Sequence, residues 1–150
     1  MKIKKDKQES SISKLLSDKQ KITSNNPENL KFSFEDFCSK QKYASSFCDW
    51  QKIGLLSKAL ETIQGYSSSP ITYDSKCTLY NDFPSKYDTL YTYPDHVTPD
   101  ASWVRIHVTG ASVIIGHIIQ NTFYVVFLDK THRFFLTKRA RQQFYGKKKE

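Results

Sequence analysis

Residues 103–129 read WVRIHVTGASVIIGHIIQNTFYVVFLD, and this stretch decides the fold. Val, Ile and aromatic residues favour β-strands, and here they gather in three runs. The runs cover residues 103–109, 112–119 and 122–129. The short breaks between them, at Thr109-Gly110 and Gln120-Asn121, suit two-residue turns. The spacing therefore predicts a C-terminal antiparallel β-meander.

Two tight turns would fix which residues lie opposite one another in the meander. The predicted cross-strand pairs are Arg105–Ile114, His107–Ser112, Ile114–Phe127, His117–Tyr124 and Ile118–Phe123. Because side chains alternate between the faces of a sheet, this register predicts a core face and a mixed face suited to binding. The predicted core face carries Val104, Ile106, Val108, Val113, Ile115, Val126 and Leu128. The predicted mixed face carries Trp103, Arg105, His107, Ser112, Ile114, Ile118, Phe123, Val125 and Phe127.

One long helix is predicted before the meander, from residue 46 to residue 66. Apolar side chains recur there at steps of three and four, which places them on one helical face. Ser45 or Ser46 suits the start of this helix, and Gly65 suits its end. The apolar stripe consists of Phe47, Trp50, Ile53, Leu56, Leu60 and Ile63. We expect the stripe to pack on the core face of the meander, which makes the fold α+β.

The remaining chain divides by composition. Residues 1–29 are rich in Lys, Ser, Gln and Asn, and they are predicted to be a flexible basic N-terminal arm. Residues 30–137 are predicted to form a single α+β domain. This domain begins with a strand at residues 30–34 and includes a long irregular connection at residues 71–101. Residues 138–150 are predicted to be a basic C-terminal tail.

The charge of the chain favours a polyanionic partner. The formal net charge is +8, and between residues 130 and 150 eight Lys and Arg residues stand against one Glu. RNA, DNA or an acidic protein fits such a balance. No signal peptide is visible and no apolar run approaches the ~20 residues of a membrane-spanning helix, so we expect a cytoplasmic protein with no membrane partner.

Residues 127–135, FLDKTHRFF, are the densest candidate for a functional site. His132 is a candidate proton-transfer group, because the unperturbed pKa of histidine is about 6.5. Arg105 and Arg133 are candidates for holding a phosphate and offsetting the charge that develops on phosphorus. Further candidates for nucleic-acid binding are Lys130, His107, Lys138, Arg139 and Arg141. The His and Cys spacings match no metal site and the glycines form no phosphate-binding loop, so we expect no metal and no cofactor.

Two segments carry a resemblance to a known family. SFCDWQKIGLL at residues 46–56 and FYVVFLDKTHRF at residues 123–134 resemble a set of small uncharacterised bacterial proteins. Those proteins share a W-x-(R/K)-I strand, a Gly-bounded hairpin and an FYVVFLDxxHxF ending. The arrangement is similar to the RelE/ParE toxin superfamily, in which helices precede a twisted antiparallel sheet. The resemblance covers about residues 30–136.

The resemblance implies a RelE-like fold and a toxin-type protein that binds RNA and cleaves it without a metal, leaving a 2′,3′-cyclic phosphate. It also implies a small acidic antitoxin as a partner. Arg105 matches a basic strand position of the family, and His132 matches its C-terminal histidine. The chain departs from RelE-type nucleases at Phe134 and Phe135, where Tyr is frequent, and at Val113, where Arg is common.

Alternatives to an endoribonuclease remain open at this stage. A nucleic-acid-binding module without catalysis fits the basic C-terminal end. An interaction protein that docks on an acidic partner also fits, with an antitoxin-like or gyrase-like target, since ParE-type members act on DNA gyrase. For the candidate residues themselves, His132 is alternatively a solvated histidine at a hairpin tip, and His107 is alternatively a structural histidine.

Overall fold

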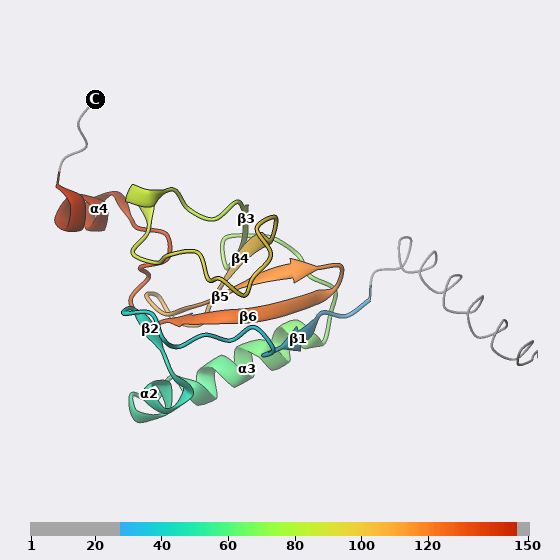
Figure 1. Cartoon of the computed structure of the whole chain (residues 1–150). Helices are drawn as coiled ribbons and strands as arrows, with labels where there is room; N and C mark the ends of the chain where they lie inside the picture. Colours follow the sequence, from blue (N-terminus) through green and yellow to red (C-terminus); the bar gives the residue numbers. More distant parts are fainter. Residues whose placement is uncertain (1–27, 147–150) are drawn as a thin grey trace, which may run out of the picture.

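The computed structural model describes residues 28–146, which form an α+β fold as the sequence predicts (Figure 1). No helix in this part of the chain is both long enough and apolar enough to span a lipid bilayer. In chain order the elements are β1 (Lys31–Ser33), β2 (Ala44–Ser45), α2 (Phe47–Lys52), α3 (Leu56–Ser67), β3 (Cys77–Asn81), the 3-10 helix η1 (Lys86–Asp88), β4 (Ser102–His107), β5 (Val113–Ile119), β6 (Thr122–Asp129) and α4 (Lys138–Tyr145).

The strands form one open sheet in the order β1-β6-β5-β4-β3. Strands β4, β5 and β6 make the antiparallel meander that was predicted, and β1 falls within the predicted strand. Both β1 and β2 pair with β6, β1 in parallel and β2 antiparallel. The prediction of an irregular connection is wrong for residues 77–81, which form the edge strand β3. This strand is short, and its partner β4 lies far along the chain, so no local pattern marks it.

The first turn of the meander is longer than predicted. The N–H of Val108 donates to the carbonyl of Ser112 at 2.8 Å, which leaves the three residues 109–111 at the turn. His107 therefore lies opposite Val113, and Arg105 lies opposite Ile115. A shift of one residue moves every side chain of a strand to the other face. The predicted pairs His107–Ser112 and Arg105–Ile114 are wrong for this reason.

The second hairpin contains a β-bulge. His117–Tyr124 and Ile118–Phe123 pair as predicted, but the register shifts between Ile115 and Gly116. A Cβ at Gly116 would lie 2.1 Å from the carbonyl oxygen of Tyr124, so the strands approach too closely there for any side chain. Beyond the bulge Ile115 pairs with Phe127, and the predicted pair Ile114–Phe127 is wrong.

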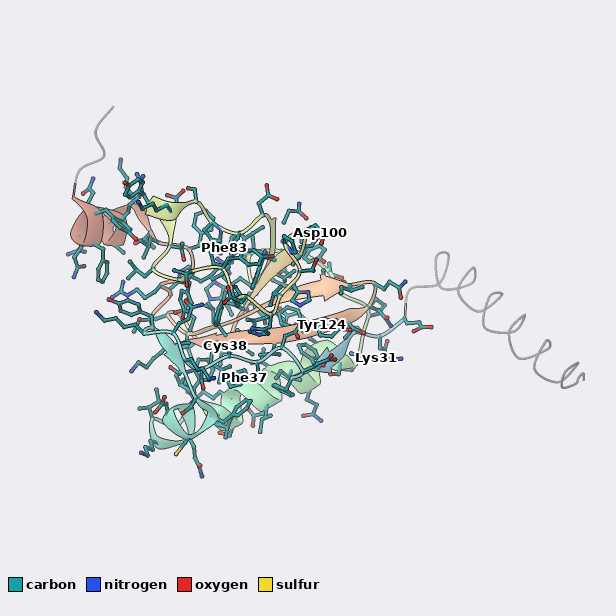
Figure 2. The ribbon with its side chains drawn as sticks, viewed as in Figure 1. Lys31, Phe37, Cys38, Phe83, Asp100 and Tyr124 are labelled. Carbon is teal, nitrogen blue, oxygen red and sulfur yellow. The ribbon has the colours of Figure 1, made fainter. Side chains whose placement is uncertain are left out.

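These two register changes sort the apolar side chains into two cores, one on each face of the sheet. The helix-side core contains Leu30, Trp50, Ala59, Cys77, Val104, Ile106, Ile114, Phe123, Val125 and Leu128. The loop-side core contains Tyr91, Val97, Trp103, Val113, Ile115, Val126, Phe127 and Phe134. In Figure 2, Phe37 lies on the side of α2 and Phe83 on the side of the long connection between β3 and β4.

The predicted faces are therefore correct for β4 and partly wrong for β5 and β6. Val104, Ile106, Val108 and Leu128 lie on the helix side, and Trp103 and Phe127 lie opposite, as predicted. Seven assignments are reversed. The longer turn inverts β5 and, through the second hairpin, the first part of β6, and the bulge restores the predicted faces at Phe127 and Leu128. The reversed residues are Val113, Ile115 and Val126, which belong to the loop side, and Ile114, Ile118, Phe123 and Val125, which belong to the helix side.

The predicted long helix is two helices, because Gly54 adopts φ +78° and ends the first. Ser46 caps α2 as predicted, accepting a hydrogen bond from the Asp49 N–H at 3.0 Å. The break changes the phase of the helix, so the predicted stripe does not share one buried face. Trp50 is fully buried, and Leu56 and Ile63 pack on the helix-side core. The other stripe residues, Phe47, Ile53 and Leu60, are 39%, 50% and 52% exposed.

The basic C-terminal segment includes helix α4. Thr137 caps its start by accepting a hydrogen bond from the Ala140 N–H at 3.1 Å. The Tyr145 hydroxyl donates to the Thr89 carbonyl at 2.8 Å, which ties the end of α4 to the loop after η1. Residues 138–145 of the predicted tail are thus helical and attached. The predicted arm lies outside the described residues for positions 1–27, and so does the tail beyond Gly146.

Candidate functional site

Three strand ends meet in one row of the sheet. His107 ends β4 and pairs with Val113, which begins β5, and Val113 pairs in turn with Asp129, which ends β6. The chain leaving β6 is therefore only one strand away from His107. His132 follows three residues after Asp129, and its ring centroid lies 5.8 Å from that of His107. We call these two residues the histidine pair.

Each histidine of the pair is oriented by a backbone carbonyl. The His107 Nδ1 lies 3.2 Å from the Thr109 carbonyl oxygen, and the His132 Nδ1 lies 3.0 Å from that of Phe135. A carbonyl oxygen only accepts hydrogen bonds, so Nδ1 carries the proton in both rings. The Nε2 atom is then the nitrogen of each ring that takes up or releases a proton. Both side chains are half-buried.

The surroundings of His107 favour its neutral form. Burial lowers the pKa of His107 below the usual value, while the hydrogen bond to Thr109 opposes this change. The positive charges of Arg105, His132 and Lys76 lower the pKa further. A neutral imidazole at neutral pH is the form that a general base requires.

The loop that carries His132 is anchored by a buried carboxylate. Asp129 accepts the backbone N–H of Arg133 at 2.9 Å and that of Phe134 at 2.8 Å. Burial raises the pKa of Asp129, and these two donors oppose the rise. His132 lies within the turn that these bonds close, with φ +61°, a left-handed conformation that is uncommon outside glycine. The carboxylate of Asp129 thus holds the backbone on which the His132 ring is placed.

Arg105 is fixed beside the histidine pair by the edge strand β3. Its Nη2 donates to the Ser75 carbonyl at 2.9 Å and to the Thr78 hydroxyl at 2.6 Å, and its Nη1 donates to the Tyr80 hydroxyl at 3.2 Å. The guanidinium also lies 5.8 Å from the centroid of the Tyr80 ring, within cation–π range. Arg105 and His107 lie on the same face of β4, two residues apart. The positive charge of Arg105 is therefore held in a defined position near the His107 imidazole.

Arg133, the third predicted catalytic residue, points elsewhere. Its guanidinium lies over the ring of Phe144 in α4, 4.7 Å from the centroid. The structure therefore brings together His132, Arg105 and His107, and it directs Arg133 toward the C-terminal helix.

The other predicted nucleic-acid-binding residues lie on the hairpin end and on α4. Lys130, Lys138 and Arg139 are exposed. Arg141 is half-buried and committed to the protein, since its Nε donates to the Tyr87 carbonyl at 2.9 Å and lies 3.1 Å from the Asp88 carboxylate. Lys130, Lys138 and Arg139 are thus the predicted bases whose charge faces solvent.

The remaining histidines are tied to Asp36. The buried His117 lies with Nε2 2.8 Å from the Asp36 carboxylate, and its ring stacks on Tyr124 at 4.9 Å. The His96 Nε2 lies 2.7 Å from the Asp36 backbone carbonyl. These contacts join the segment after β1 to the sheet and to the long connection before β4. Both histidines therefore hold segments of the fold together.

Sequence reasoning missed Thr78, Tyr80 and Asp129 as parts of the site. Thr78 and Tyr80 lie two residues apart, so in a strand they share a face, and this was the only available signal. Asp129 stands in the quoted motif, but its role depends on folding of the loop behind it. Searches against family models, curated proteins and solved structures gave no match to this chain.

Proposed function

We propose that this chain is a RelE-like toxin-type protein that binds RNA and cleaves it at the histidine pair. The observation that carries the proposal is the 5.8 Å separation of the His107 and His132 rings beside the fixed guanidinium of Arg105. Attack of a ribose 2′-hydroxyl on the adjacent phosphodiester needs a general base, a general acid and a positive charge, and two imidazoles and a guanidinium supply these groups. Such a step needs no metal.

In this mechanism His107 acts as the general base. Its Nε2 removes the proton of the ribose 2′-hydroxyl, and the oxygen attacks the adjacent phosphorus. His132, in its protonated form, gives a proton from Nε2 to the departing 5′-oxygen. The P–O5′ bond breaks, and the products are a 2′,3′-cyclic phosphate and a free 5′-hydroxyl.

Arg105 offsets the negative charge that develops on phosphorus. Three of its N–H groups donate to Ser75, Thr78 and Tyr80, so its main contribution is a positive charge held in place rather than a bidentate clamp. We assign the exposed Lys130, Lys138 and Arg139 to non-specific binding of the RNA backbone. The net charge of +8 supports both the RNA and an acidic antitoxin as partners.

The test is cleavage of single-stranded RNA by the purified full-length chain, with and without EDTA, and with the new ends mapped. We expect 2′,3′-cyclic phosphate ends, and no cleavage where the ribose 2′-hydroxyl is methylated. His132→Ala should lower the rate by about 10²–10⁴-fold and leave RNA affinity nearly unchanged. His96→Ala is the matched control. The His96 ring contacts the Asp36 backbone carbonyl, so this variant should retain full activity.

The pH profile separates the two roles. The pKa of His107 is lowered, so the rate should hold as the pH falls through about 6.5 and then drop when His107 takes up its proton. His107→Ala should remove this acid limb, whereas His132→Ala should lower the rate and leave the acid limb in place. If the wild-type protein binds RNA without cutting it, the function that remains is that of a non-catalytic RNA-binding module. If it binds no RNA, the whole proposal is contradicted.

A further inference from the structure

Two adjacent phenylalanines of the His132 loop differ in burial. Phe134 is fully buried in the loop-side core, where it contacts Trp103 at 5.5 Å between ring centroids. Phe135 is 37% exposed. Phe135 is one of several exposed apolar side chains, and it is distinguished by its place in the loop that carries His132.

The ring of Phe135 packs on a neighbouring ring. It stacks on Tyr80 with centroids 4.8 Å apart and planes 29° apart. Tyr80 in turn accepts the hydrogen bond from Arg105 at 3.2 Å, and its ring also stacks on Phe134 at 6.1 Å. The rings of Phe135, Tyr80 and Phe134 thus form a short aromatic column that runs from the surface into the loop-side core. The guanidinium of Arg105 lies beside the Tyr80 ring.

The column stands directly beside the histidine pair. The backbone carbonyl of Phe135 is the acceptor that orients His132, at 3.0 Å. Arg105, which acts on the pKa of His107, also contacts the Tyr80 ring. A phosphate between the two imidazoles would therefore place a neighbouring nucleobase within reach of the Phe135 ring.

We infer that Phe135, supported by Tyr80, is a stacking site for one unpaired nucleobase next to the cleaved phosphate, and that the substrate is single-stranded RNA. This inference rests on the proposed function. Bases of a duplex are enclosed in their own stack, whereas single strands offer bases that stack on protein rings. The stacked base sets the position of the ribose 2′-hydroxyl before His107.

The test uses short single-stranded RNA with 2′-O-methyl riboses, which lack the 2′-hydroxyl that the proposed cleavage needs. Phe135→Ala should weaken binding by about 5- to 100-fold, the range expected for one base–aromatic stack. Phe135→Tyr keeps the ring and should restore binding. Phe34→Ala is the matched control, because Phe34 is 43% exposed and packs against Phe47 of α2.

A scan with single abasic nucleotides locates the stacked base. At one position, the abasic nucleotide should weaken binding by the wild type. The same nucleotide should not weaken binding by Phe135→Ala any further, because that variant has already lost the contact. If the wild type binds RNA and the variants Phe135→Ala and Phe34→Ala bind it with equal affinity, the stacking site alone is overturned. Equal binding of duplex and single strand overturns the choice of substrate. Failure of the wild type to bind any RNA overturns the proposed function as well.

Discussion

The two faces of the sheet are covered by different kinds of chain. On one face the regular helices α2 and α3 pack on aliphatic side chains, and each helix satisfies its own backbone hydrogen bonds. On the other face the covering chain is irregular and meets an aromatic core. Irregular chain must find partners for its backbone groups elsewhere. Here two loops supply them to each other, as in Leu90 N–H to the Arg133 carbonyl at 3.0 Å and Leu136 N–H to the Asp88 carbonyl at 2.7 Å.

The difference explains where the polar chemistry lies. A helix that covers a sheet seals it with apolar side chains, whereas the buried His117 lies on the loop side beside its cross-strand partner Trp103. The irregular chain covers only part of the other face. Trp103 is fully buried beneath it, whereas Arg105 and His107, further along β4, are half-buried. The loop side is thus both a core and a surface for binding.

The largest effect is expected where both faces depend on one residue. Gly116→Ala places a Cβ 2.1 Å from the Tyr124 carbonyl oxygen and 2.5 Å from the Phe123 ring. The strands must separate, so the free energy of unfolding should fall by about 3 kcal/mol or more, measured by urea denaturation. Gly110→Ala is the control, because nothing lies within 4 Å of its Cβ position. Equal stability of the two variants would contradict the bulge.

A second test concerns the loop side alone. Phe134→Ala removes a fully buried ring and should lower the free energy of unfolding by about 3–5 kcal/mol. Phe135→Ala, one residue along, should lower it by about 1 kcal/mol or less, because that ring is partly in solvent. Thermal or urea unfolding of both variants measures the ratio. Similar losses would mean that Phe135 belongs to the core and is not a surface platform.

The smallest effects are expected on the helix side. Leu56→Ala should cost about 2 kcal/mol, since Leu56 packs on the helix-side core but is not fully buried. Leu60→Ala should change the free energy of unfolding by no more than about 0.5 kcal/mol, because its side chain is 52% exposed. A loss at Leu60 as large as that at Leu56 would indicate that this part of α3 is covered in solution.

The class of fold could be predicted because its signals are local. Runs of β-branched residues marked β4, β5 and β6, and apolar periodicity marked the helical region. The faces could not be predicted in full, because they depend on one extra residue in the turn at Thr109 and on the close approach at Gly116. A glycine within a strand was the visible sign of a bulge.

The types of residue in the candidate site could be predicted from the sequence, but the residues that each of them contacts could not. His132, His107 and Arg105 were selected because imidazole and guanidinium suit phosphate chemistry. Their arrangement depends on the register of the two hairpins, which sets the row from His107 to Asp129. Arg133 was selected on the same grounds, but its direction is decided by Phe144, a residue eleven positions later in another element.

The two tryptophans of the chain lie one on each side of the sheet, and both are fully buried. Trp50 belongs to the helix-side core and Trp103 to the loop-side core. The protein therefore carries one tryptophan for each face, and tryptophan emission can be excited apart from that of tyrosine at long wavelength. Trp50→Phe leaves an emission signal that follows only the loop side, and Trp103→Phe leaves one that follows only the helix side. Stopped-flow traces of these two variants would show whether the two layers assemble together or in succession.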